Sequence, residues 1–358
     1  MAISASMVKE LREMTGAGMM DCKKALAETD GDMDAAVELL RKSGAAKAEK
    51  KASRIAAEGI ARVATNGTEA VVAEVNSETD FVAKNEVFQE FVQTVADNAL
   101  ASGLNGGANG EDVEAVLGMN GLQELLIEKT STIGEKLSFR RFAKVSGDCV
   151  ATYIHAGGKI GVLVAATGAN GDAEKEALVN VAMQIAAMNP QYIGRADIAQ
   201  SEIDKMRDIT VDSSLNDSAS LPKPILNALF AKAVDGKLFS EEDLAIYEEK
   251  KNDKYLFNFL SDAAKATLSE LAMQDKANIV GDKIFSGMIE GRISKQLKEI
   301  SLLDQVYVKA EDGKQTVGKY LESVNKALTV TNFVRFEVGE GMEKKNEDFA
   351  AEVAAQLG

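Results

Sequence analysis

Few side chains in this sequence are of the types that usually carry out catalysis. There is one histidine, His155, and the two cysteines, Cys22 and Cys149, are far apart and form no C-x-x-C motif. Most nucleophile–base arrangements need a histidine or an activated cysteine, and no G-x-S-x-G motif is present. Residues 313–320, GKQTVGKY, nearly match a phosphate-binding loop, but Tyr320 stands where serine or threonine must hold magnesium. We therefore predict a protein that is not an enzyme and has no metal or cofactor of its own.

The clearest candidates for recognition lie in residues 74–85, EVNSETDFVAKN. Apolar side chains alternate over residues 70–75, as in a half-buried strand, and recur at helical spacing over residues 87–95. The polar residues between them predict a loop with Asp80 and Phe81 at its tip. A phenylalanine there either packs back beside the start of its own helix, which is the commoner arrangement, or projects as an anchor for a partner.

The composition is typical of a helix-rich globular protein. The 358 residues are 46% hydrophobic and 27% charged, and this length is sufficient for two or three domains. The net charge of −15 argues against a nucleic-acid partner, because nucleic-acid affinity comes mainly from neutralising phosphates. No apolar stretch approaches membrane-spanning length, and the first ten residues resemble neither a signal nor a transit peptide. We expect a cytoplasmic protein with no membrane contact.

Three short helices are predicted within residues 1–43. Gly16 and Gly18 separate the first two helices, and capping residues at 29–32 separate the second from the third. Met19 and Met20 are adjacent, and neighbours on a helix point about 100° apart, so we expect at least one to be exposed. Exposed methionine suits an adaptable binding surface. The alternative is an irregular core filler beside one stray surface residue.

Two similar hairpin–helix patterns follow. In the first, strand-like segments flank Asn66–Gly67 and a helix begins at Lys84; in the second, they flank Gly157–Gly158 and a helix covers residues 172–189. This repetition predicts two related α/β subdomains with antiparallel sheets. His155 lies at the tip of the second hairpin, where a histidine is more often simply exposed than functional.

Residues 200–300 lose the strand signals and gain charge. Two apolar stripes at helical spacing, within residues 260–271 and 289–300, predict an inserted helical arm of coiled-coil character. The stripes either pack on each other within the chain or form a homodimer contact. Strand patterns return at residues 306–308 and 333–338, and we expect both to pair with the second hairpin.

The predicted fold class is therefore α+β. The positions at which helix and strand signals change define the order of its segments. The segments are an N-terminal three-helix bundle with a linker helix leading out of it at 1–54, a first core subdomain at 55–140, a second core subdomain in two parts at 141–203 and 291–340, a helical insertion or dimerisation arm at 204–290, and a C-terminal helical module at 341–358 with a short amphipathic helix at 346–357.

Several segments resemble sequence signatures of the translation elongation factor Ts family. Residues 11–26, LREMTGAGMMDCKKAL, and residues 76–85, NSETDFVAKN, are long and nearly unbroken matches. Residues 153–164 and 334–341 resemble the second subdomain and the C-terminal end of that family. The resemblance covers the chain except for about residues 204–285, where this sequence is longer.

The resemblance implies guanine nucleotide exchange on elongation factor Tu during translation. A protein of this kind binds Tu with GDP, displaces magnesium, promotes GDP release and stabilises nucleotide-free Tu until GTP binds. The family's N-terminal bundle resembles ubiquitin-associated domains and contacts the G domain of Tu. The residues implied to dislodge magnesium are Thr79, Asp80, Phe81 and Val82. The other residues implied to contact Tu are Arg12, Met19, Met20 and His155, the last as the companion of the loop from the second subdomain.

A reading from another class remains open. It is a helical adaptor whose N-terminal bundle binds ubiquitin-like or other partners, and such a protein would need no projecting loop residue. Its partners would not centre on a G protein.

Overall fold

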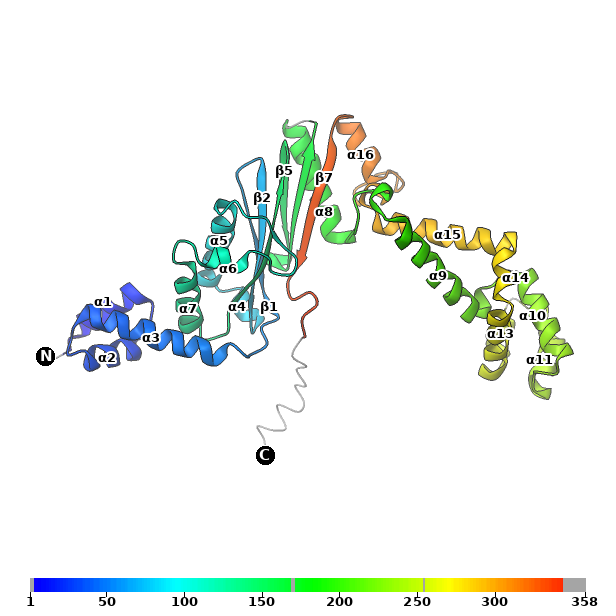
Figure 1. Ribbon diagram of the computed structural model, residues 1–358, viewed down its shortest axis with the longest axis horizontal. Coiled ribbons are helices and arrows are strands. Elements are labelled where there is room, and N and C mark those ends of the chain that lie inside the picture. Colours follow the sequence, from blue (N-terminus) through cyan, green and yellow to red (C-terminus); the bar gives the residue numbers. More distant parts are fainter. Residues whose placement is uncertain (1–2, 169–170, 254, 344–358) are drawn as a thin grey trace. The chain divides into compact units, whose positions relative to one another are not determined.

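The chain folds into two compact units. The computed structural model describes residues 3–168, 171–253 and 255–343, so the helix expected at 346–357 lies outside the described residues. One unit comprises Met1–Asn189 with Val306–Gly358, and the other comprises Pro190–Gln305. The second unit therefore begins before and ends after the arm predicted at 204–290. Helices and two antiparallel sheets make the fold mixed α+β, as predicted (Figure 1).

The N-terminal bundle consists of α1 (Ala5–Thr15), α2 (Met19–Glu28) and α3 (Met33–Lys51). Helix α1 ends where Gly16 takes the left-handed conformation with φ 65°, which glycine adopts without a steric penalty. Helix α3 continues unbroken to Lys51, because alanine and lysine favour helix. The separate linker helix expected after the bundle is thus the second half of α3, which packs against α7 (Leu122–Ile133).

The first sheet has four strands in the order β1-β2-β4-β3. Their bounds are β1 (Glu58–Thr65), β2 (Glu69–Ser77), β3 (Gly106–Gly107) and β4 (Ser138–Ser146). Strands β1 and β2 pair from Thr65 with Ala70 onward, so the connection is longer than the two-residue turn expected at Asn66–Gly67. Helices α5 (Glu86–Ala101) and α6 (Val113–Leu117) pack against this sheet (Figure 1).

The second sheet has three strands in the order β5-β6-β7, with bounds β5 (Cys149–His155), β6 (Ile160–Thr167) and β7 (Thr329–Glu337). Helix α8 (Asp172–Met188) packs against it, and α16 (Val317–Val324) packs on α8. Strand β7 confirms the pairing predicted for residues 333–338. The pairing predicted for 306–308 is wrong. The side-chain amide of Gln184 donates a hydrogen bond to the Val306 carbonyl and accepts one from the Val308 N–H, where a neighbouring strand would bind.

The two sheets share a hydrophobic layer, which makes β2 buried along almost its whole length. Val71 and Val75 belong to the core beneath α5. Val72 packs on the other face with Leu163 and Phe336 of the second sheet. The half-buried strand expected from alternation is therefore a strand buried on both faces, because a second sheet covers the side that was expected to face water.

The second unit is helical in its described residues. Its helices are α9 (Gln200–Asn216), α10 (Lys223–Asp235), α11 (Glu241–Lys250), α12 (Leu256–Phe259), α13 (Asp262–Gln274), α14 (Lys276–Gly281) and α15 (Lys283–Ile300). Both predicted apolar stripes belong to one core cluster, in which Leu268 of α13 and Ile289 and Ile293 of α15 are buried. Of the two arrangements expected for the stripes, the structure shows packing within the chain.

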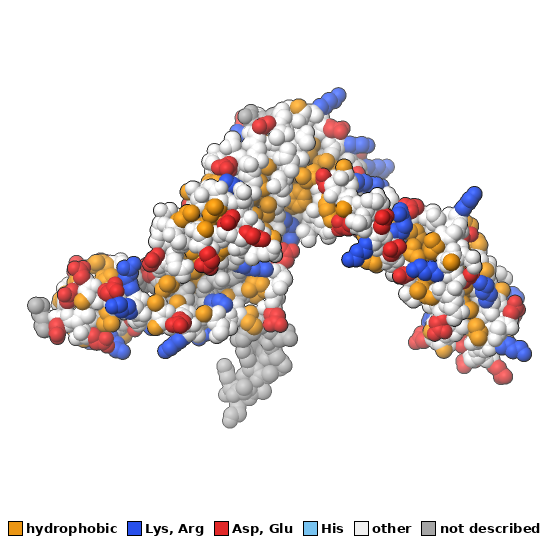
Figure 2. Space-filling view, in the orientation of Figure 1, with side chains coloured by type: hydrophobic (Ala, Val, Ile, Leu, Met, Phe, Trp, Pro, Cys, Tyr) orange, Lys and Arg blue, Asp and Glu red, His pale blue; other side chains and the backbone are white. Residues whose placement is uncertain are grey.

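The surface mixes charge types. Figure 2 shows acidic and basic side chains interspersed on the visible face of each unit, with scattered hydrophobic side chains between them. Across the described ranges, no helix has both the length and the apolar character that crossing a membrane requires.

Candidate functional site

The candidate site is the loop that joins β2 to α5. It contains the four-residue helix α4 (Asp80–Ala83), and Asn85 then caps α5 by accepting a hydrogen bond from the Phe88 N–H at 3.1 Å. Val82 is 8% exposed and belongs to the core beneath α5, whereas Phe81 is 76% exposed. One side of α4 is thus anchored in the core and the other presents a bare ring to solvent. Of the two arrangements expected for Phe81, packing back on its own helix is therefore wrong and the projecting ring is confirmed.

Two carboxylates hold the base of this loop. Glu135 accepts hydrogen bonds from the N–H of Glu78 at 3.1 Å, from the N–H of Thr79 at 3.0 Å and from the Thr79 hydroxyl at 2.6 Å. The Glu78 carboxylate in turn accepts the Lys136 N–H at 2.6 Å and an Arg54 N–H at 3.2 Å. The sequence pattern did not indicate Glu135, because it lies 56 residues from Thr79 and belongs to no local motif.

Asp80 and Phe81 share a cation on the exposed side of the loop. Lys84 donates to the Asp80 carboxylate at 3.0 Å, and its ammonium nitrogen lies 5.8 Å from the centre of the Phe81 ring. The hydrogen bond from Lys84 lowers the pKa of Asp80 below its usual value, with a smaller contribution from the charge of Lys159. Because Lys159 belongs to the second hairpin, the loop and that hairpin lie near the same end of the two sheets.

The tip of the second hairpin rests on β1. A short 3-10 turn at Ala156–Gly158 follows β5, and Gly158 has φ 109° with no room for a side chain, since a Cβ there would lie 2.9 Å from Ile60. Lys159 forms an ion pair with Glu58 of β1. His155 is exposed, and its Nδ1 lies 3.1 Å from the Tyr153 hydroxyl. The hairpin therefore presents His155 on an anchored tip.

The three candidate residues of the N-terminal bundle are all on its surface. Arg12 is exposed in the last turn of α1, Met19 is 58% exposed and Met20 is 74% exposed. The alternative that one of the two methionines fills the core is wrong. Two adjacent exposed methionines form a flexible apolar surface of the kind that adapts to a partner.

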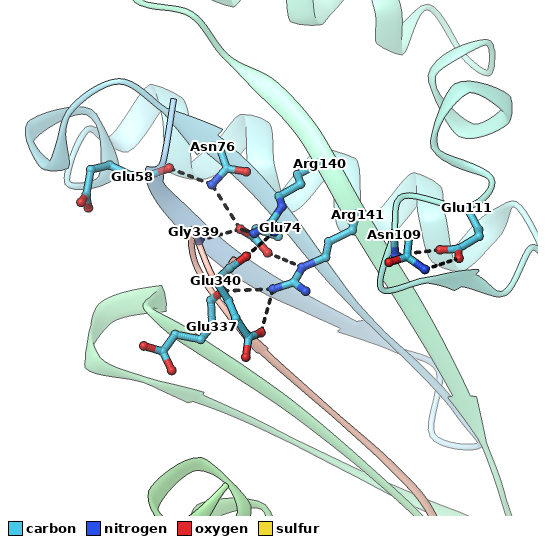
Figure 3. Close-up of polar contacts among 10 residues, drawn as sticks. All are labelled: Glu58, Glu74, Asn76, Asn109, Glu111, Arg140, Arg141, Glu337, Gly339 and Glu340. Carbon is cyan, nitrogen blue, oxygen red and sulfur yellow. Dashed lines mark hydrogen bonds and ion pairs between the residues drawn. The ribbon is translucent and has the colours of Figure 1, made fainter. Parts of the chain in front are cut away.

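A buried ion network lies just before the loop, and sequence reasoning did not find it. Glu74 of β2 is fully buried and accepts hydrogen bonds from Arg141 at 2.5 Å and from Arg140 at 2.9 Å, both on β4. It also accepts the Gly339 N–H at 2.9 Å, from a residue 265 positions away. Figure 3 shows Glu74 between the two arginines and the chain that leaves β7.

Arg141 extends this network to the end of β7. It donates to the Glu337 carbonyl at 3.0 Å and to the Glu340 carboxylate at 3.3 Å, and its guanidinium lies 4.1 Å from the centre of the Phe336 ring. The network thus joins β2 and β4 of the first subdomain to β7 of the second. It does so near the end of β2, the strand that leads into the Phe81 loop.

Wherever side chains are described, no group of three or more histidine, cysteine, aspartate or glutamate side chains is placed to hold a metal ion. A comparison with protein families gives a match to the family described as elongation factor Ts over residues 78–340. That range is well over half of the chain and includes the Phe81 loop, the second hairpin and the helical unit.

Proposed function

Since the chain belongs to the elongation factor Ts family, whose members act as nucleotide exchange factors for elongation factor Tu in translation elongation, we propose that it releases GDP from Tu by displacing the magnesium ion of Tu. It binds Tu with GDP, promotes loss of magnesium and then of GDP, and stabilises nucleotide-free Tu until GTP binds. No covalent bond is made or broken in these steps. The proposal places the protein in the cytoplasm, with Tu rather than nucleic acid or a membrane as its partner.

The physical basis is linkage between two binding events. A G protein holds its nucleotide largely through a phosphate-binding loop and magnesium. A factor that binds the nucleotide-free form more tightly than the GDP form must weaken GDP binding by the same ratio. The factor therefore needs contacts that Tu can make only when the region around magnesium has moved.

The main support for the proposal is the exposed ring of Phe81. The ring is 76% exposed at the tip of a loop whose base is tied by hydrogen bonds. Fully burying a phenylalanine side chain is worth about 1.5–3 kcal/mol, which corresponds to roughly 10- to 100-fold in an equilibrium constant. Insertion of this ring between elements of Tu near the magnesium site would supply that free energy only to the displaced arrangement.

The remaining contacts are proposed to increase affinity rather than to move magnesium. Arg12, Met19 and Met20 would contact the G domain of Tu, and His155 would act beside the loop from the second hairpin. We propose different tasks for the four residues implied for magnesium displacement. Asp80 and Phe81 face outward, whereas Val82 anchors the loop in the core and Thr79 is bonded to Glu135.

The test is release of a fluorescent GDP analogue from Tu by catalytic amounts of the protein. Replacing Phe81 with alanine is expected to slow release about 10- to 100-fold. Phe259→Ala is the matched control, because Phe259 is 45% exposed in the second unit and also lies beneath a lysine, Lys250. Release by Phe81→Ala at the parent rate would contradict the proposal.

We also propose that any homodimer forms through exposed apolar side chains of the helical unit, since its predicted stripes are buried. Those side chains include Ile209, Leu238, Tyr255 and Ile284. Light scattering before and after deletion of Asp204–Asp282 tests this role. A mass that changes only by the deleted residues would rule it out.

A further inference from the structure

We propose that Glu135 positions the Phe81 loop, the segment that joins β2 to α5. This inference rests on the proposed function. Its carboxylate accepts both backbone N–H groups at the start of the loop and the Thr79 hydroxyl, at 3.1, 3.0 and 2.6 Å. Within the part of the chain that the structure describes, these three donors bond to no other acceptor. Glu135 therefore determines the direction in which the chain leaves β2 and enters the helix that carries Phe81.

The hydrogen bonds between residues 78–79 and residues 135–136, which we call the clamp, run in both directions. This makes the clamp stiffer than a single side-chain contact. While Glu135 accepts from the backbone of residues 78–79, the Glu78 carboxylate accepts the Lys136 N–H at 2.6 Å. Two adjacent pairs of residues thus bind each other's backbone through carboxylates. Hydrogen bonds to an ionised acceptor are shorter and stronger than those between neutral groups.

The same clamp includes the chain that leaves the N-terminal bundle. Arg54, which lies beyond α3, donates to Glu78 at 3.2 Å, and Lys136 donates to the Arg54 carbonyl at 2.8 Å. The bundle and the loop are therefore tied to one point. We infer that a partner held by Met19 and Met20 meets a Phe81 loop whose position is already set relative to the bundle.

This geometry assigns Thr79 an internal role. Its hydroxyl is engaged by Glu135, and its carbonyl accepts the Ser77 hydroxyl at 3.0 Å. A threonine in such a place positions the loop instead of touching the partner. Thr79→Ser retains the hydroxyl and is expected to behave like the parent, whereas Thr79→Val removes the 2.6 Å hydrogen bond with little change of shape.

The cost of losing the clamp is expected to appear when Tu binds. A loop that is already ordered loses little conformational freedom on association, whereas a loose one must be ordered at that moment. Glu135→Ala is therefore expected to raise the concentration needed for half-maximal exchange about tenfold, with a smaller effect on the maximal rate. Thr79→Val is expected to change it in the same direction by less. Glu124→Ala, which removes an exposed glutamate on α7, is the control and is expected to match the parent.

The deciding experiment is a double-mutant cycle between Glu135→Ala and Phe81→Ala in fluorescent-GDP release from Tu. If Glu135 acts by positioning Phe81, its substitution has little further effect once the ring is gone. Fully additive effects, or a Glu135→Ala variant with the parent's half-saturation, would overturn the inference while leaving the proposed function intact. If Phe81→Ala itself does not slow release, the proposed function fails.

Hydrogen exchange separates positioning from general stability. Loss of the clamp is expected to reduce protection of the Glu78 and Thr79 amides in Glu135→Ala while protection along β2 is retained. Equal loss of protection along β2 would show a structural role and contradict the inference. If Glu135→Ala fails to fold, the comparison of Thr79→Val with Thr79→Ser in the same release assay decides, and equal rates for the two would overturn the proposal.

Discussion

Two carboxylates near the end of β2 differ in what surrounds them and therefore in what they do. Glu74 is fully buried and is paired with two arginines, of which Arg141 also binds the end of β7. Glu135 is half-buried and accepts only backbone N–H groups and a hydroxyl from the loop. A buried charge must be compensated within the fold, whereas a charge near the surface is partly solvated. Glu74 therefore holds the two subdomains together, whereas Glu135 sets the position of a loop.

The largest effect is expected from removing the buried carboxylate. Glu74→Ala leaves the guanidinium of Arg141 buried without its main partner, and breaking such a pair typically costs about 3–5 kcal/mol. Chemical denaturation, followed by a probe in the first unit, should show a correspondingly lower midpoint. An unchanged midpoint would mean that the network does not hold the two sheets together. Glu74 and Glu135 would then not differ in their importance for stability.

The backbone partner of Glu74 gives a second large effect. Gly339 donates to Glu74 with φ 75°, and a Cβ there would lie 2.2 Å from the Ala57 carbonyl oxygen. Gly339→Ala must therefore shift the chain after β7, and a strained backbone position of this kind costs about 1–3 kcal/mol. The free energy of unfolding measures it. Gly313→Ala is a control that separates strain from the clash, because Gly313 also has positive φ but has nothing within 4 Å.

A much smaller stability effect is expected at the surface carboxylate. Glu135→Ala removes hydrogen bonds that are only partly buried, so the free energy of unfolding should fall by only about 1 kcal/mol. Thermal unfolding of Glu74→Ala and Glu135→Ala under the same conditions gives the comparison directly. Equal losses in the two variants would show that Glu135 is as much a part of the core as Glu74.

The sequence predicted the local elements well and the long-range contacts poorly. The strands of the two hairpins and the cap at Asp32 depend on residues that lie close together in the chain, and the structure confirms them. The pairing of residues 333–338 with the second hairpin is confirmed as well, although it joins distant parts of the chain. For Phe81 the local pattern left two arrangements open, and the structure shows the projecting one. The neighbouring Val82 is the residue that enters the core beneath α5.

Glu74 and Glu135 were missed for a common reason. Apart from Asn76, which donates to Glu74 from two residues away, their partners lie 56 to 265 residues away. A lone glutamate at the end of a strand or helix carries no periodic signal. The alternation of β2 likewise indicated one buried face, because the sheet that covers the other face is built from distant strands. A charged residue within an otherwise apolar strand was the signal available at Glu74, since such a residue is seldom buried without a partner.

The smallest effect concerns the charge of the loop itself. The hydrogen bond from Lys84 lowers the pKa of Asp80, so the folded carboxylate stays ionised to a lower pH than the unfolded one. Its contribution is therefore complete above the unfolded pKa of about 3.9 and is lost only as the pH falls through the lower folded pKa.

Exchange between pH 6 and pH 8 should consequently show no step that belongs to Asp80. NMR titration of the Asp80 carboxyl, compared with a short peptide of the same sequence, measures the shift, and the Asp80→Asn variant should retain the parent's pH profile over that range. A carboxyl that titrates above its peptide value would mean that Lys84 does not pair with it in solution. The loop would then be held from its base alone, by Glu135, which would widen the contrast between the clamped start of the loop and its free tip.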